Sequence, residues 1–217
     1  MKKIVLSLLT SVVAATTSFG QEQPKAMKID ARKLLAFGIK LGANLSNVYD
    51  TKGDQFQADA KLGFATGGFI SIPIGTYIGI QPELLFSQKG FRATGGSGLS
   101  YYSITRTTNY IDIPVFFAFK PVELVTLFAG PQYSYLLKQT DVFANGTTSI
   151  MQEKEFQNDD VRKNMLCFVT GADINFNHFV FGARVGWDVQ SNNGDGTSNT
   201  PRYKNVWYQA TLGYRLF

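Results

Sequence analysis

The sequence closes on V-W-Y-Q-A-T-L-G-Y-R-L-F, residues Val206 to Phe217, in which apolar and polar residues alternate. The apolar positions are Val206, Tyr208, Ala210, Leu212, Tyr214 and Leu216, and the polar phase holds Gln209, Thr211, Gly213 and Arg215. A period of two predicts a strand with one apolar and one polar face. An aromatic end to such a strand favours a barrel sealed by its last strand. Phe217 is out of the apolar phase, which predicts a bulge there or a place just beyond the barrel rim.

The other end of the sequence resembles a targeting segment. Lys2 and Lys3 precede a short apolar run, Ile4 to Ala15, and small residues follow at Ser18 and Gly20. This order predicts a signal peptide over residues 1–20, cleaved before Gln21. The apolar run is too short to be a membrane-spanning helix.

The rest of the chain divides into a polar lead-in, residues 21–35, which we expect in the periplasm, and a barrel domain, residues 36–217. Loss of Lys2 and Lys3 lowers the formal charge from +5 to +3, because 5 − 2 = 3. That charge is too small to indicate a nucleic-acid partner. The single cysteine, Cys167, excludes an intramolecular disulfide framework.

The composition favours a β-rich membrane protein. Aromatic residues make up 14% of the chain and charged residues only 17%, and there are 21 glycines. The mean hydropathy is −0.05, a value that a soluble protein could also have. Strands of a membrane barrel average to such values because their apolar and polar residues cancel.

Seven more segments alternate as the last one does, which makes eight candidate strands. Together they cover about 37–46, 61–72, 78–89, 110–119, 125–137, 166–176, 179–190 and 206–216. Their connections are in turn long and short, with tight turns expected at 73–76, 120–123 and 177–178 and long loops at 49–60, 90–108, 138–164 and 191–204. Membrane barrels have even strand numbers, short periplasmic turns and longer outer loops. The sequence therefore predicts an all-β fold, an eight-stranded antiparallel up-and-down transmembrane β-barrel with both termini in the periplasm.

The apolar faces of these strands would meet lipid, and the opposite faces carry charge. The charged positions are Lys40, Lys89, Arg184 and Arg215, with Glu83, Asp112, Asp173 and Asp188. An eight-stranded barrel is just wide enough for side chains to fill, and unpaired charges inside it would be costly. We therefore expect an ion-paired plug with Glu83 and Arg184 at its centre. Two alternatives remain open: a gated ion path through the same residues, and a soluble ligand-binding barrel with its apolar face inside.

Several motifs point to a known family. They are I-Q-P-E-L-L-F-S-Q-K-G (Ile80 to Gly90), Y-I-D-I-P (Tyr110 to Pro114), G-I-K-L-G-A-N-L-S-N (Gly38 to Asn47) and G-A-R-V-G (Gly182 to Gly186). From Phe37 to Phe217 the chain resembles the PorT-like outer-membrane β-barrel family of Bacteroidetes-type bacteria. The resemblance implies an eight-stranded barrel that usually has no assigned activity.

Catalytic and metal-binding residues are scarce. The only histidine, His178, falls in an expected turn, and Cys167 is interpreted as a small filler on the inner face. One Cys and one His do not form a transition-metal site, so no cofactor is expected. The sequence thus predicts a non-enzymatic, monomeric barrel in the bacterial outer membrane. Its expected partners are outer-membrane lipid and lipopolysaccharide, and envelope proteins that bind its outer loops.

Overall fold

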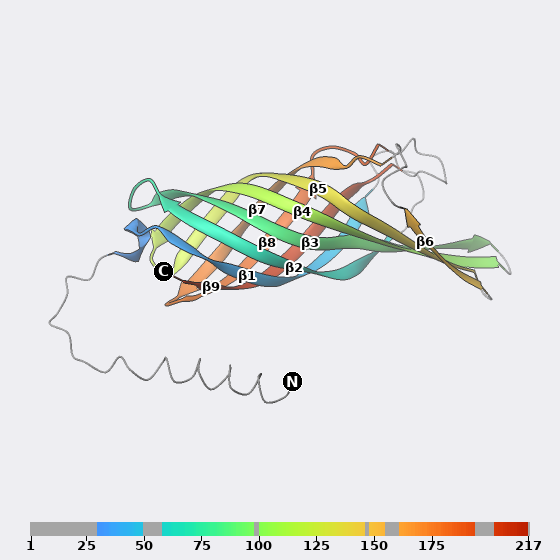
Figure 1. Ribbon diagram of the computed structural model, residues 1–217, viewed down its shortest axis with the longest axis horizontal. Helices are drawn as coiled ribbons and strands as arrows, with labels where there is room; N and C mark the ends of the chain where they lie inside the picture. The colour runs from blue at the N-terminus through green and yellow to red at the C-terminus, as the bar shows by residue number, and fades with distance from the viewer. Residues whose placement is uncertain are drawn as a thin grey trace, which may run out of the picture.

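The computed structural model describes residues 30–49, 58–97, 100–145, 148–154, 161–193 and 202–216. In these residues the chain forms one short 3-10 helix and nine strands (Figure 1). They are η1 (Ala31–Lys33), β1 (Ala36–Tyr49), β2 (Ala58–Pro73), β3 (Ile78–Ser97), β4 (Ser100–Val122), β5 (Val125–Asn145), β6 (Thr148–Lys154), β7 (Asn164–Phe176), β8 (Phe179–Asp188) and β9 (Lys204–Arg215). The expected signal peptide lies outside the described residues.

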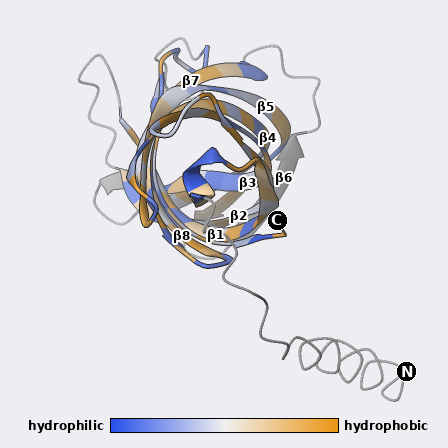
Figure 2. Ribbon diagram, turned by 90° about the vertical axis from the view of Figure 1, so that its left-hand side faces the viewer, coloured by the Kyte–Doolittle hydropathy of each residue, from blue (hydrophilic) through white to orange (hydrophobic). Residues whose placement is uncertain are grey.

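Eight of the strands close into a ring. Each strand pairs antiparallel with its neighbour in the order β4-β3-β2-β1-β9-β8-β7-β5, and the β4–β5 pairing closes the circle. β6 pairs only with β5, outside the ring. Figure 2 looks along this ring from one end. The predicted eight-stranded antiparallel barrel is confirmed.

The final strand has the place and the phase that its alternation predicts. β9 lies between β8 and β1, with Gly38 opposite Arg215 and Tyr49 opposite Lys204. Tyr208 and Leu212 are exposed on the outside, whereas Gln209 is buried inside. The seal predicted for the last strand is therefore confirmed, and Phe217 lies outside the described residues.

The barrel has two unlike ends. At one end, called the turn end below, β1 begins, β9 ends, and the connections are residues 74–77, 123–124 and 177–178. Asn177 adopts a positive φ of 53° in the turn at 177–178, a conformation that Asn tolerates better than most residues. The turn predicted at 120–123 is displaced to Glu123 and Leu124, because β4 continues to Val122.

At the opposite end, called the loop end below, two of the predicted loops are largely strand. Residues 90–97 and 100–108 are paired strand, with a ladder that runs from Lys89 opposite Thr108 to Ser97 opposite Ser100. Much of 138–164 is also strand, because β5 extends to Asn145 and β6 pairs with this extension. The long strands β3, β4 and β5 thus project far beyond the ring (Figure 1). Phe91 and Ala93 continue to bury alternate side chains in the first part of this extension, so the ladder does not stop at the barrel rim.

The outer surface of the ring is apolar. Many large side chains are largely exposed there, among them Ile39, Leu62 and Tyr208, at 60%, 70% and 62%. Water would penalise such a surface, and lipid would not. Charged side chains instead occupy the inside, where Lys40, Glu83 and others are buried. The soluble alternative, with its apolar face inside, is therefore wrong.

Candidate functional site

Glu83 accepts hydrogen bonds from four donor atoms inside the barrel. Arg184 donates from Nη1 to Oε2 at 2.7 Å and from Nη2 to Oε1 at 2.9 Å. Lys40 Nζ and Gln81 Nε2 each donate to Oε1 at 2.9 Å. Lys40 Nζ also lies 3.1 Å from Asp173 Oδ2. Lys40, Glu83, Asp173 and Arg184, called the central network below, thus join two cations and two carboxylates with no net charge.

Strands that are distant in sequence supply the central network, and its side chains are buried. Lys40 comes from β1, and its partner Glu83 is 43 residues away on β3; Arg184 of β8 is 101 residues beyond Glu83. The exposed fraction of each charged side chain is 2% or less. Loss of one member of such a buried pair costs about 3–5 kcal/mol, because the other charge is left uncompensated. The network therefore holds a specific arrangement of four strands in register.

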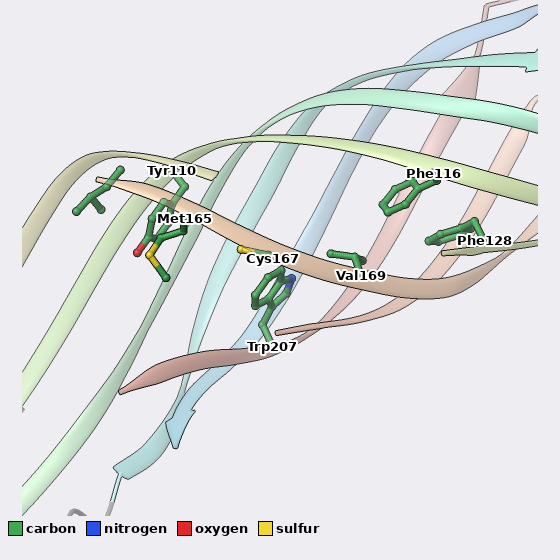
Figure 3. Packing of buried hydrophobic residues seen from close by; sticks show 8 residues of the cluster. Tyr110, Phe116, Phe128, Met165, Cys167, Val169 and Trp207 are labelled. Carbon is green, nitrogen blue, oxygen red and sulfur yellow. The ribbon is translucent and has the colours of Figure 1, made fainter. Parts of the chain in front are cut away.

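Aromatic rings surround the two cations. Lys40 Nζ lies 4.6 Å from the ring centroid of Phe69, and the Arg184 guanidinium lies 5.3 and 5.1 Å from those of Phe116 and Phe128. Figure 3 shows Phe116 and Phe128 packed close together. Their role was not predicted from the sequence. The sequence offered one signal for this role, namely an apolar residue at a position where the alternation calls for a polar one, on the face that also carries the cations.

A second cluster lies toward the loop end. Lys89 Nζ is 3.1 Å from Asp112 Oδ2, which also accepts a 2.6 Å hydrogen bond from Ser87 Oγ. The same ammonium lies 3.7 Å from the ring centroid of Trp207 and 4.9 Å from that of Tyr110. An aromatic cage and one carboxylate therefore hold this buried cation.

Asp188 is held by neutral donors. The backbone N–H of Asn205 donates to Oδ2 at 2.9 Å. The side-chain amide of Asn205 also donates to this oxygen, and Cys167 Sγ donates to Oδ1 at 3.1 Å. Within the described residues no cation lies within ion-pair distance of this carboxylate. Cys167 is buried beside Trp207 (Figure 3), so its predicted place as an inward filler is confirmed.

Arg215 lies at the turn end and forms no ion pair with the carboxylates of the described residues. Its Nη2 donates to Asn175 Oδ1. The nearest cation of similar depth is Lys120, whose Nζ donates to Ser71 Oγ at 2.8 Å. Lys120 was missed in the sequence because the expected turn included it, whereas the strand continues past it and its side chain points inward.

Polar contacts also cover the loop end of the lumen. Arg106 donates from Nε and Nη2 to the two carboxylate oxygens of Asp141 at 2.7 and 2.8 Å, and from Nη1 to the Tyr203 hydroxyl at 3.1 Å. The ring of Tyr203 packs edge-on against Phe91 at 5.3 Å. This group draws β3, β4, β5 and the segment before β9 together above the second cluster.

The short helix η1 covers the turn end. Asp30 caps it by accepting the backbone N–H of Arg32 at 3.0 Å. Arg32 also donates from Nη1 to the Pro121 carbonyl at 3.1 Å and lies 4.9 Å from the ring centroid of Tyr77. Since β4 is three places round the ring from β1, η1 reaches across the barrel mouth. The hydrogen bonds from Arg32 lower the pKa of Asp30 to about 2.

Catalytic groups are sparse in the described residues. His178 is exposed in a turn and stacks on Tyr214 at 5.6 Å. No three His, Cys, Asp or Glu side chains in the described part of the chain are grouped so that they could hold a metal ion. The same part contains no helix with the length and apolar character needed to cross a membrane.

Comparison with known families identifies the barrel. Residues 19–189 match the family described as outer membrane protein beta-barrel domain, which is well over half of the chain. The chain belongs to this family. It is an outer-membrane β-barrel of bacteria, so its turn end faces the periplasm and its loop end the exterior. No curated protein matches the sequence.

Several solved structures of outer-membrane proteins are similar to this barrel at low identity. Ail, the attachment invasion locus protein of Yersinia pestis, is 17% identical over 83% of this chain and 98% of its own, with a TM-score of 0.49. Neisserial surface protein A is 10% identical over 82% and 96%, with a TM-score of 0.45. OprG of Pseudomonas aeruginosa is 12% identical over 84% and 95%, with a TM-score of 0.36.

Proposed function

We propose that this protein is a non-enzymatic outer-membrane barrel that does not conduct and that acts through its projecting outer strands. The observation that carries the proposal is the central network. A pore lined by two cations and two anions would keep them hydrated, whereas Lys40, Glu83, Asp173 and Arg184 are almost fully covered. A dry, neutral group in the lumen is a barrier to ions, because an entering ion would have to displace a bonded charge.

Single-channel recording in planar bilayers tests this proposal. The wild-type protein is expected to give no discrete, reproducible conductance steps. Glu83→Gln leaves two cations without their carboxylate, and Glu123→Gln, at an exposed turn residue, is the matched control for the same chemical change. Stable wild-type channels whose step size changes in Glu83→Gln, and not in Glu123→Gln, would overturn the proposed plug.

The narrow pore for small solutes or ions is the second candidate. One observation favours it: Asp173 Oδ1, Arg184 Nε and Thr211 Oγ1 are buried without a hydrogen-bond partner in the described residues. Buried polar atoms of this kind are usually satisfied by water, and a file of water would form a path. The same recordings decide between plug and pore.

The finer family assignment is also a proposal. The motifs that resemble the PorT-like family encode the lumen: Ile80–Gly90 supplies Glu83 and Lys89, and Tyr110–Pro114 supplies Asp112. These motifs therefore support a common lumen design.

For the binding role we propose envelope proteins or lipopolysaccharide as partners of a monomeric barrel. The support is the extension of β3, β4, β5 and β6, which stands clear of the ring (Figure 1). Pull-down from intact envelopes with the full chain, and with a variant shortened at 92–104 and 142–154, tests it. Partners retained equally by both forms would contradict a role for the extension.

A further inference from the structure

Two cations meet inside the turn end of the barrel. Arg215 stands opposite Gly38 of β1, and Ser71, which accepts from Lys120 Nζ, stands opposite Ala36 on the other side of β1. Both side chains point inward, so the ammonium and the guanidinium flank the start of the same strand. Only one strand, β1, separates Arg215 from the hydroxyl that accepts from Lys120, so the two like charges repel each other.

Neither cation has an anionic partner. Within the described residues no carboxylate lies within ion-pair distance of Lys120 or Arg215; their printed contacts are the Ser71 hydroxyl and the Asn175 amide oxygen. Arg215 Nε is buried and has no hydrogen-bond partner. Lys120 is only 8% exposed. Lys120 is buried and Arg215 half-buried, and two like charges placed in this way beside neutral groups are unfavourable, so this arrangement lacks an anion.

The central network does not provide that anion. Asp173 is a carboxylate of this network, but Lys40 already contacts it at 3.1 Å. The two cations and two carboxylates of the network also balance each other in charge. Asp30 is occupied as well, since Arg32 binds both of its carboxylate oxygens. Asp173 attracts Arg215 from beyond ion-pair distance, so within the described residues the two positive charges of Lys120 and Arg215 are compensated only in part.

We propose that Lys120 and Arg215 form a binding site for a small oxoanion, such as inorganic phosphate, inside the periplasmic mouth of the barrel. An oxoanion offers several acceptor oxygens, which suit a guanidinium N–H edge and an ammonium at once. The Ser71 hydroxyl, 6% exposed, adds a neutral donor beside the two cations, because it only accepts from Lys120, whereas the Asn175 amide already donates to Thr126 Oγ1 and to the Glu123 carbonyl. The site does not depend on whether the lumen conducts, since it lies between the mouth and the central network.

Calorimetric titration tests the site. The full barrel, folded in detergent and free of phosphate, is titrated with inorganic phosphate at constant ionic strength, and saturable binding of one phosphate per barrel is expected. Lys120→Met and Arg215→Gln should each weaken binding about tenfold or more, as expected for loss of one charged donor. Lys33→Gln is the matched control, because it removes an exposed positive charge of the neighbouring η1.

Arg215→Lys guards against misfolding as the cause of lost binding. It keeps the charge but removes the Nε–H, so it is expected to bind phosphate more weakly than the wild type, with an unchanged circular dichroism spectrum. Absence of saturable binding to the wild type would overturn the proposal. So would a loss of binding in Lys33→Gln as large as that in Lys120→Met, since the effect would then be one of general charge.

Discussion

Removal of the Glu83 charge is expected to destabilise the barrel strongly. Glu83→Gln keeps the shape of the side chain, yet Arg184 and Lys40 lose the carboxylate that they contact at 2.7 to 2.9 Å. The amide nitrogen that replaces one oxygen would also oppose a donor of the guanidinium. All these groups are at most 2% exposed, so water cannot compensate, and the free energy of unfolding should fall by about 3–5 kcal/mol.

Urea unfolding of the barrel in lipid vesicles, followed by tryptophan fluorescence, measures this loss. Glu123→Gln should stay within about 0.5 kcal/mol of the wild type, because Glu123 is exposed. Adding Arg184→Met to Glu83→Gln should cost less than the sum of the two single changes, since the double variant removes both charges of one pair. A loss below about 1 kcal/mol in Glu83→Gln, or strict additivity of the two changes, would refute the buried network.

Three further outcomes are expected. The low pKa of Asp30, about 2, means that its contact with Arg32 stabilises η1 fully above the unfolded pKa near 3.8, and that this stabilisation is lost as the pH falls through about 2. NMR of the Arg32 Nε–H should show this proton protected from exchange at pH 5 and exchanging at pH 1.5. A signal unchanged by acid would contradict the contact between Asp30 and Arg32. Gly186→Ala should shift tryptophan emission and cost about 1–3 kcal/mol, because the new Cβ would lie 2.5 Å from Trp207 Cε2; unchanged emission would contradict this packing. Tyr203→Phe should cost about 0.5–1.5 kcal/mol in urea unfolding by removing the 3.1 Å hydrogen bond from Arg106, and a neutral change would argue against that bond.

The barrel itself could be predicted from the sequence because its strands obey one rule. Lipid outside and charge inside impose a period of two on every strand. This period made the last strand and the closed ring predictable from the sequence. The rule fails beyond the membrane. Residues 90–108 are polar and glycine-containing, as loops are, yet residues 90–97 and 100–108 pair because β3 and β4 extend each other's ladder beyond the rim.

The contacts inside the lumen could be predicted only in part, for a different reason. Alternation places Glu83 and Arg184 on the inner face, but which charges meet depends on the stagger between strands, and this stagger is a property of the closed barrel. Arg215 accordingly pairs with no carboxylate of the described residues and donates to Asn175 instead. Phe69 and Phe128 interrupt the pattern of their strands because they pack against the buried cations.

The central claim is that the lumen is closed, and Cys167 reports on it directly. This single cysteine is 1% exposed inside the barrel, between the central network and the Arg106–Asp141 pair. Labelling of the folded protein in lipid vesicles with a small water-soluble thiol reagent measures whether the Cys167 thiol is accessible from water. Thr94→Cys in a Cys167→Ser background is the exposed control. The account predicts that Cys167 reacts only after unfolding while Cys at position 94 reacts at once. Rapid modification of Cys167 in the folded barrel would contradict it.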